Sequence, residues 1–306
     1  MNYNRFSIPF LLLFLLCGGF LFGQNDNGSF EKLPLAAKGA TLNLISDQFS
    51  FSEGPAVDKQ GDIFFTDQPN DRIWEYSTAG RLSVFMDKTG HSNGLYFNPQ
   101  GDLIACADEK DELWSISREK NIKVLMTGFQ GRRLNGPNDL WINENGGIYF
   151  TDPYYQRSYW VRKKPDIKAQ RVYFLPKGKH DPIVVEDALL KPNGIVGTPN
   201  GKYLYVADIE AGKTFRYKIH KDGTLYDRQL FVTQGSDGMT LDNQGNVYLC
   251  GNGVTIYNKK GKLVGHISIP QNWTGNICFG GKKRNLLFIT ASKAVYTLKM
   301  NVKGVE

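Results

Sequence analysis

Short apolar runs separated by glycine-containing turns recur from about residue 40 to the C-terminus. Six segments share one order: a polar residue, an apolar strand, a turn and a second strand, such as residues 62–67 or 147–152. In the first five, a glycine stands eight residues after the opening residue. The opening residues are Glu53, Asn93, Asn138, Asn193, Asp237 and Gly275. No sustained helical period appears beyond residue 40, so the pattern predicts short strands throughout.

The spacing of these segments predicts the fold class. The opening residues lie 38 to 55 residues apart, and repeats of about 40 to 50 residues with several short strands are typical of β-propeller blades. The sixth segment ends after residues 296–298, one strand short, and the apolar run at residues 40–45 can supply that strand. We therefore predict an all-β, six-bladed β-propeller with four antiparallel strands per blade. The N-terminal strand would close the ring and remove an open edge.

The first residues have the pattern of a secretory signal. One positive charge at Arg5 precedes the apolar residues 8–22, and a polar segment follows from Gly23. The apolar run is shorter than the roughly 18 to 20 residues that span a bilayer. We expect a signal peptide at residues 1–23, a linker at 24–39 and one propeller domain at 40–306. The protein would be periplasmic or extracellular, with no stable membrane span after cleavage. An uncleaved anchor is the alternative, and Cys17 leaves a lipoprotein form open.

Charge and cysteine content exclude some functions. The formal net charge is +7, but no run of five basic residues occurs, so we expect no nucleic-acid partner. Beyond the predicted signal, only Cys106, Cys250 and Cys278 remain. This odd and sparse set predicts neither a disulfide framework nor a zinc site.

The opening residues form a candidate metal site. Five of the six carry a side-chain carboxylate or amide oxygen, and the blade topology places them near the central axis on one face. Ca²⁺ prefers six to eight oxygen ligands. The four histidines have no paired spacing, which disfavours a histidine-built zinc site. Asn-Gly and Asp-Gly pairs are also common in tight turns. Glu53 has no turn preference, however, and all five oxygen-bearing residues share one repeat register.

Five motifs in order resemble the SMP-30/gluconolactonase/LRE-like family. They are Phe-Ser-Glu-Gly-Pro at 51–55, Asn-Gly-Pro-Asn-Asp at 135–139, Phe-Thr-Asp-Pro at 150–153, Pro-Asn-Gly at 192–194 and Ser-Asp-Gly-Met at 236–239. Members are six-bladed propellers with a divalent cation in the central tunnel, and many hydrolyse sugar lactones. The resemblance implies Glu53, Asn138, Asn193 and Asp237 as metal ligands, with Asn135 as an alternative to Asn138. Ca²⁺ is the expected ion, with Mg²⁺, Mn²⁺ or Zn²⁺ as alternatives.

The implied activity is hydrolysis of a carboxylic ester, the opening of sugar (aldono)lactones such as gluconolactone. A central cation would polarise the carbonyl group. Asp237 would act as general base or orient the attacking water, or a water held by the ion would be the nucleophile. A phosphotriesterase or arylesterase on the same site is one alternative. A non-catalytic ligand-binding propeller with a structural cation is another.

Further residues are candidates for substrate binding. Arg133 and Asn135 resemble the family's substrate-contacting Arg-x-Asn, although Arg133 could also be a solvated loop charge. Asp152 ends a second strand on the same face as the opening residues. Tyr155 belongs to an aromatic segment, residues 153–160, that could form a lid on a sugar ring or simply pack on neighbouring blades. Ser92 lies in a G-x-S-x-G pattern, but a strand follows it instead of a helix, so we expect no nucleophile there.

Overall fold

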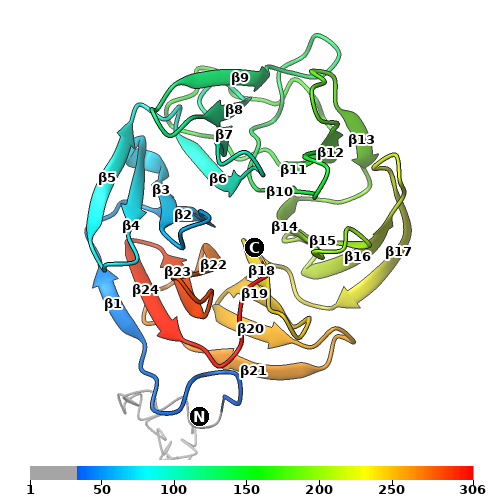
Figure 1. The fold of residues 1–306 in the computed structure, drawn as a ribbon. Coiled ribbons are helices and arrows are strands. Elements are labelled where there is room, and N and C mark those ends of the chain that lie inside the picture. Colours follow the sequence, from blue (N-terminus) through cyan, green and yellow to red (C-terminus); the bar gives the residue numbers. More distant parts are fainter. Residues whose placement is uncertain (1–32, 306) are drawn as a thin grey trace, which may run out of the picture.

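The computed structural model describes residues 33–305, and the predicted signal peptide at residues 1–23 lies outside this range. Six four-stranded antiparallel sheets surround a central axis (Figure 1). This arrangement confirms the predicted six-bladed propeller. No helix in the described part of the chain has the length and apolar character needed to cross a membrane.

Each blade takes its strands from consecutive parts of the chain, except at the closure. Blade 1 contains β2 (Ser52–Val57), β3 (Ile63–Asp67), β4 (Arg72–Tyr76) and β5 (Leu82–Asp87), with a short 3₁₀ helix η2 (Gln68–Asn70). Blade 2 contains β6 (Ser92–Phe97), β7 (Leu103–Ala107), β8 (Glu112–Ile116) and β9 (Ile122–Met126). Blade 3 contains β10 (Leu140–Ile142), β11 (Ile148–Asp152), β12 (Arg171–Leu175) and β13 (Ile183–Glu186). Blade 4 contains β14 (Pro192–Gly197), β15 (Tyr203–Asp208), β16 (Lys213–Ile219) and β17 (Leu225–Val232). Blade 5 contains β18 (Met239–Leu241), β19 (Val247–Gly251), β20 (Gly253–Tyr257) and β21 (Leu263–Ile267).

The sixth blade joins the two ends of the chain. It contains β22 (Asn276–Gly280), β23 (Leu286–Ala291), β24 (Ala294–Lys299) and, at its outer edge, β1 (Asn43–Ser46). β1 pairs antiparallel with β24, with Asn43 opposite Thr297. The predicted closure by the N-terminal strand is therefore confirmed. Part of the predicted linker packs beside it, because Leu33, Leu35 and Ala36 are buried in the core of blades 5 and 6.

Burial follows the layers of each blade. The inner strands β2 and β3 are buried along their whole length, whereas the outer strand β9 is mostly exposed. Apolar side chains fill the spaces between neighbouring blades, as where the rings of Phe65 in blade 1 and Phe288 in blade 6 lie 5.3 Å apart. Each fully buried large apolar side chain stabilises the fold by about 1.5–3 kcal/mol. Blade-to-blade packing therefore fixes where the inner strands stand.

The glycine after an opening residue lies inside a strand in three blades. Gly54, Gly94 and Gly194 belong to β2, β6 and β14, where the strand register shifts. A Cβ on Gly94 would lie 2.5 Å from the carbonyl oxygen of Asn138 in the next blade, and a Cβ on Gly194 would overlap the carbonyl of Asp237. These pairs are therefore not tight turns. The glycines allow neighbouring inner strands to approach each other at the axis.

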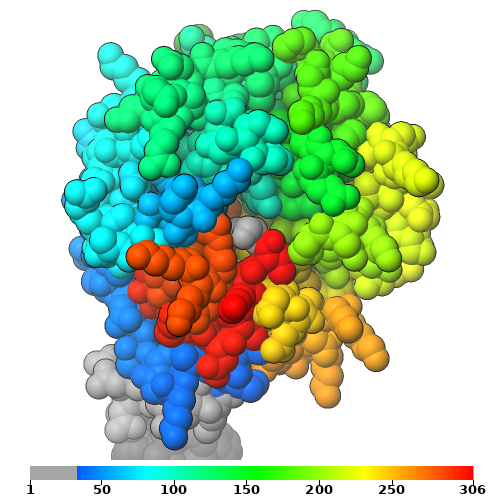
Figure 2. Space-filling model, viewed as in Figure 1, coloured from blue at the N-terminus to red at the C-terminus, as the bar shows by residue number. Residues whose placement is uncertain are grey.

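The C-terminal segment lies at the other end of the axis. Gly304 bridges to Asp242, and its N–H donates to the carbonyl of Arg284 at 2.8 Å. The far ends of inner strands, with Val57, Phe97 and Val305, line a cavity of about 630 Å³ there. Figures 1 and 2 show the C-terminal residues in the middle of the ring. The face with the opening residues is thus the opposite one.

Candidate active site

The opening residues come together because each stands at or just before the start of an inner strand. Glu53, Asn93 and Asn193 lie within β2, β6 and β14, while Asn138 and Asp237 precede β10 and β18 by two residues. All are buried except Asp237, which keeps partial exposure. The inner strands of five of the six blades therefore place an acidic or amide side chain near the axis, and the sixth opening residue is Gly275.

The carboxyl groups at this face influence one another. Burial raises the pKa of Glu53 well above its usual value, and the charge of Asp237 raises it further. Burial also raises the pKa of Asp237 to about 6, although hydrogen bonds from Trp273 and Asn193 and the charge of Arg157 lower it. Burial raises the pKa of Asp139 to about 7, with a further contribution from Asp237. The site therefore gathers several acidic groups in a place where their ionisation is disfavoured.

Two amide oxygens at the site are buried without a hydrogen bond within residues 33–305. The Nδ2 of Asn193 donates to the Tyr155 hydroxyl at 3.0 Å, while its Oδ1 has no partner there. The Oδ1 of Asn93 is also buried without a hydrogen bond among these residues. A buried polar atom without a partner costs about 1–3 kcal/mol. Oxygen atoms of this kind beside two carboxylates are the donor set that a hard dication requires.

The donor set is a mixed one. No group of three or more His, Cys, Asp or Glu side chains in the described part of the chain has the arrangement of a metal site. The predicted ligands instead combine two carboxylates, Glu53 and Asp237, with amides. Asn138 is held by its backbone, whose N–H donates to the carbonyl of Thr151 at 2.9 Å. The residues present thus fit an oxygen-coordinated cation.

Asp237 is oriented by an indole that the sequence did not indicate. The Nε1 of Trp273 donates to Oδ2 of Asp237 at 2.6 Å. Trp273 lies in the loop between β21 and β22, 36 residues further along the chain. No repeat pattern or motif marks this position, because the contact depends on how two blades meet.

The predicted substrate residues fall into three places. Tyr155 reaches the opening residues through Asn193. Asn135 and Asp152 bind each other: the Asp152 carboxylate accepts the N–H groups of Asn135 at 3.0 Å and Gly136 at 2.9 Å. Both are fully buried, and the Oδ1 of Asn135 has no hydrogen bond among residues 33–305. Arg133 lies outside, with a side chain 53% exposed and paired with Asp166 at 3.1 Å.

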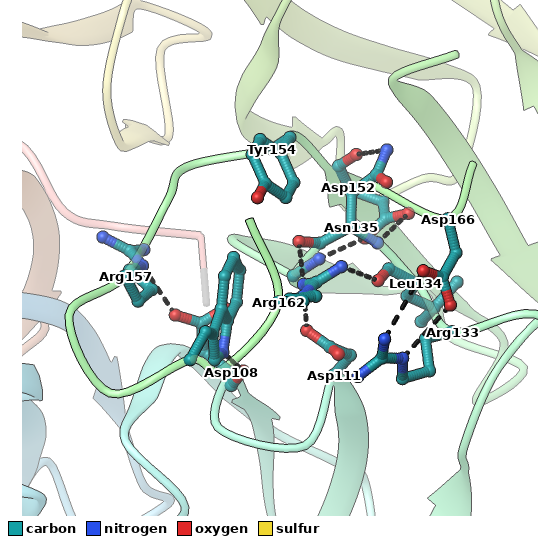
Figure 3. Close-up of polar contacts among 12 residues, drawn as sticks. Asp108, Asp111, Arg133, Leu134, Asn135, Asp152, Tyr154, Arg157, Arg162 and Asp166 are labelled. Carbon is teal, nitrogen blue, oxygen red and sulfur yellow. Dashed lines mark hydrogen bonds and ion pairs between the residues drawn. The ribbon is translucent and has the colours of Figure 1, made fainter. Parts of the chain in front are cut away.

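The segment between β11 and β12, residues 153–170, crosses to blade 2, and we call it the lid. Arg157 Nε and the Tyr159 hydroxyl donate to Oδ2 of Asp108 at 2.7 and 2.6 Å. Arg162 bonds Asp111 at 2.5 Å and the carbonyl of Asn135 at 2.6 Å (Figure 3). The lid therefore both packs on a neighbouring blade and delivers Tyr155 to the site.

The serine of the G-x-S-x-G pattern is inert in this structure. Ser92 is fully buried, and its hydroxyl donates to the carbonyl of Thr89 at 2.6 Å. The adjacent His91 ring stacks on Tyr159 at 3.9 Å and bonds the carbonyl of Gln68. Among residues 33–305, no histidine or carboxylate bonds the Ser92 hydroxyl, which agrees with the expectation that Ser92 is not a nucleophile.

Comparison with known proteins identifies the class. Residues 51–293 match the SMP-30/Gluconolactonase/LRE-like region, so the chain belongs to this family. A gluconolactonase of Zymomonas mobilis is 32% identical over 200 residues, which cover 59% of this chain and 55% of that protein. The chain thus spans about half the length of this curated relative.

Two solved structures are similar over most of their length. The X-ray structure of a protein assigned to the gluconolactonases has a TM-score of 0.83 and 29% identity, covering 90% of this chain and 97% of the other. A gluconolactonase of Xanthomonas campestris has a TM-score of 0.80 and 28% identity, with 87% and 91% covered. Fold and family thus agree with the motifs in the sequence.

Proposed function

We propose that the protein is a lactonase that opens sugar lactones such as gluconolactone. The observation that carries the proposal is the buried pair Glu53 and Asp237 beside the unpartnered Oδ1 of Asn193. The gluconolactonases to which the chain is similar support the choice of substrate. A lactone is a cyclic ester, and its hydrolysis needs a polarised carbonyl group and an activated water.

The site would hold a divalent cation, Ca²⁺ first, on Glu53, Asn138, Asn193 and Asp237. When bound, such an ion acts as a Lewis acid on the carbonyl group. Asp237 orients the attacking water or takes its proton. The bond from Trp273 to Oδ2 fixes the orientation of this carboxyl group. With a pKa of about 6, this carboxyl group is ionised at neutral pH and can accept a proton.

The lid would bind the substrate and exclude water from the site. Tyr155 stays protonated at neutral pH because burial raises the pKa of its hydroxyl. That hydroxyl accepts a bond from Asn193 and keeps its own proton for a substrate oxygen. The buried lid residue Trp160 bonds the carbonyl of Asp108 at 2.9 Å and holds the lid in place. A water-poor site strengthens such interactions.

We also propose that the protein is exported. The support is the signal-like pattern of residues 1–23 in the sequence. N-terminal sequencing of the protein recovered from the periplasm or medium tests this proposal. A start near residue 24 is expected, and a cytoplasmic chain that begins at Met1 would contradict it.

Acid release from a panel of aldonolactones tests the proposed activity. The enzyme is assayed after chelation, after calcium is restored, and as Asp237→Asn, with Asp227→Asn as a matched control at an exposed ion pair. Loss of turnover on chelation, recovery with calcium and a drop of about 100-fold or more in Asp237→Asn alone are expected. If no lactone is hydrolysed but phosphotriesters or aryl esters are, the protein is a phosphotriesterase or arylesterase that uses the same site. If calcium raises the melting temperature without changing the turnover, the ion has a structural role only.

A further inference from the structure

Two cationic side chains converge on Tyr155 beside the opening residues. The guanidinium carbon of Arg157 lies 5.5 Å from the centre of the Tyr155 ring. The ammonium nitrogen of Lys191, just before β14, lies 5.0 Å from the same centre. Because the Tyr155 hydroxyl bonds Asn193 at 3.0 Å, both positive charges stand next to the candidate metal site.

Arg157 directs hydrogen-bond donors that the fold does not use. Its Nε–H donates to Asp108, but its two Nη groups make no hydrogen bond to any residue from 33 to 305. Figure 3 shows the outer end of Arg157 pointing away from the cluster of Asp152 and Arg162. The guanidinium therefore lies against Tyr155 with both Nη groups free of hydrogen bonds among the described residues.

We propose that Arg157 and Lys191 bind a carboxylate carried by the lactone, so that lactones of dicarboxylic sugar acids are the preferred substrates. This inference rests on the proposed lactonase function. The two Nη groups of an arginine fit both oxygens of a planar carboxylate, and a lysine adds a point charge. The Tyr155 ring beside both cations offers an apolar surface for the C–H groups of a sugar.

The carboxylates that contact Arg157 and Lys191 leave both side chains able to bind a substrate. Glu210, the partner of Lys191 at 3.1 Å, has a side chain that is 54% exposed, and a pair of this kind is worth little. Asp108 accepts bonds from Gln68 and Tyr159 as well as from Arg157. It fixes Arg157 through Nε and does not occupy the Nη groups. A cation on Glu53 and Asp237 offsets their repulsion of an anionic substrate.

Arg157 and Arg133 differ in their availability to a substrate. Arg133 is paired with Asp166 through both Nε and Nη2 and is largely exposed. Arg157 has a side chain only 23% exposed and lies against Tyr155. The arginine that meets the substrate thus comes from the lid.

The test compares two lactones of the same ring size, glucaro-1,4-lactone with a carboxylate and glucono-1,4-lactone without one. We expect wild-type kcat/KM to favour the carboxylate-bearing lactone by about 10-fold or more. Arg157→Gln and Lys191→Gln should each reduce this preference by about fivefold, mainly through KM of the carboxylate-bearing lactone. Arg72→Gln is the matched control, because its Nε also contacts a carboxylate, that of Asp87, at 2.7 Å on an outer strand. The Arg72→Gln variant should prefer the carboxylate-bearing lactone as strongly as the wild type does.

Equal kcat/KM values for the two lactones, or a preference that both variants retain, would overturn the inference. If Arg157→Gln disturbs the lid, Lys191→Gln carries the test, because its side chain does not contact Asp108. If neither lactone is hydrolysed, the proposed function fails separately. Calorimetric titration with glucarate and with glucitol, which has no carboxylate, then decides the carboxylate site. Tighter binding of glucarate that is lost in both variants supports the site, and equal binding refutes it.

Discussion

Glu53 is buried and Asp237 is partly buried, and neither has a basic partner at hydrogen-bond distance among residues 33–305. Burial raises the pKa of both, and the charge of Asp237 raises that of Glu53 further. For a carboxyl group whose folded pKa is raised, stability is fully present below the unfolded pKa. It is lost as the pH rises through the folded pKa, here about 6 for Asp237. The free energy of unfolding of the ion-free protein should therefore fall as the pH rises from about 4 to 7.

Calcium should reverse this loss, and its effect should grow with pH. At pH 8 the Asp237 carboxyl group is ionised, and the ion compensates a penalty on the order of 2 kcal/mol. At pH 5 protonation already relieves much of that penalty. Thermal melting of chelated protein, with and without calcium, should give an increase of about 5 °C at pH 8 and a smaller one at pH 5.

Glu53→Gln provides the comparison for this experiment. The variant removes one of the two charges, so the chelated protein should lose less stability between pH 5 and 8. Glu75→Gln on the half-exposed strand β4 serves as the control and should behave like the wild type. An equal calcium effect at both pH values in the wild type would contradict the electrostatic explanation.

Which site residues were predictable depends on what encodes their position. Glu53, Asn193 and Asp237 could be found because the repeat register brings equivalent positions of every blade to the axis. Arg157 could not, because its bond to Asp108 joins residues 49 positions apart in different blades. Arg133, selected by motif, lies on the exposed side of its loop. Local patterns encode strand positions, whereas loop contacts depend on the assembled ring.

At the scale of the strand, close approach at the axis is the main constraint. Gly194→Ala would place a methyl group against the Asp237 carbonyl of the next inner strand. Backbone atoms cannot move aside as a flexible side chain can, so we expect a loss of about 1–3 kcal/mol. Chemical denaturation measures it. Gly101→Ala, with open space but a φ of 96°, should cost about 1 kcal/mol through strain alone. An equal or larger loss at Gly101 would contradict the packing argument.

Asp108 is one of the carboxylates that hold the lid. Asp108→Asn removes the charge that Arg157 and Tyr159 share, and breaking a buried pair costs about 3–5 kcal/mol. The lid should then open more often, so hydrogen exchange and trypsin cleavage at residues 157–164 should accelerate. Asp87→Asn, at the exposed pair with Arg72, should leave both unchanged. Unchanged lid exchange in Asp108→Asn would show that Trp160 and Arg162 suffice to hold the lid.

The repeat pattern specified the whole ring, including its closure, because each blade buries its neighbour's side chains. A six-bladed ring needs 24 strands, and the sixth segment of the repeat supplies only three. The pairing of β1 with β24 completes the set. The sequence could not indicate how residues 33–36 add to this closure, because Leu33 and Leu35 precede the repeat and their burial depends on blades 5 and 6.

Deletion of residues 1–46 tests whether closure holds the molecule together. The deletion exposes the edge of β24 and the core beneath Leu33 and Leu35, so this edge can pair with other chains. We expect a lower melting temperature, a broader transition and dimers or aggregates in light scattering. A chain that begins at residue 33 retains all these contacts and should unfold in one sharp transition. If the shorter chain stayed monomeric with the same melting temperature, the remaining 23 strands would form a ring that is stable without its N-terminal strand.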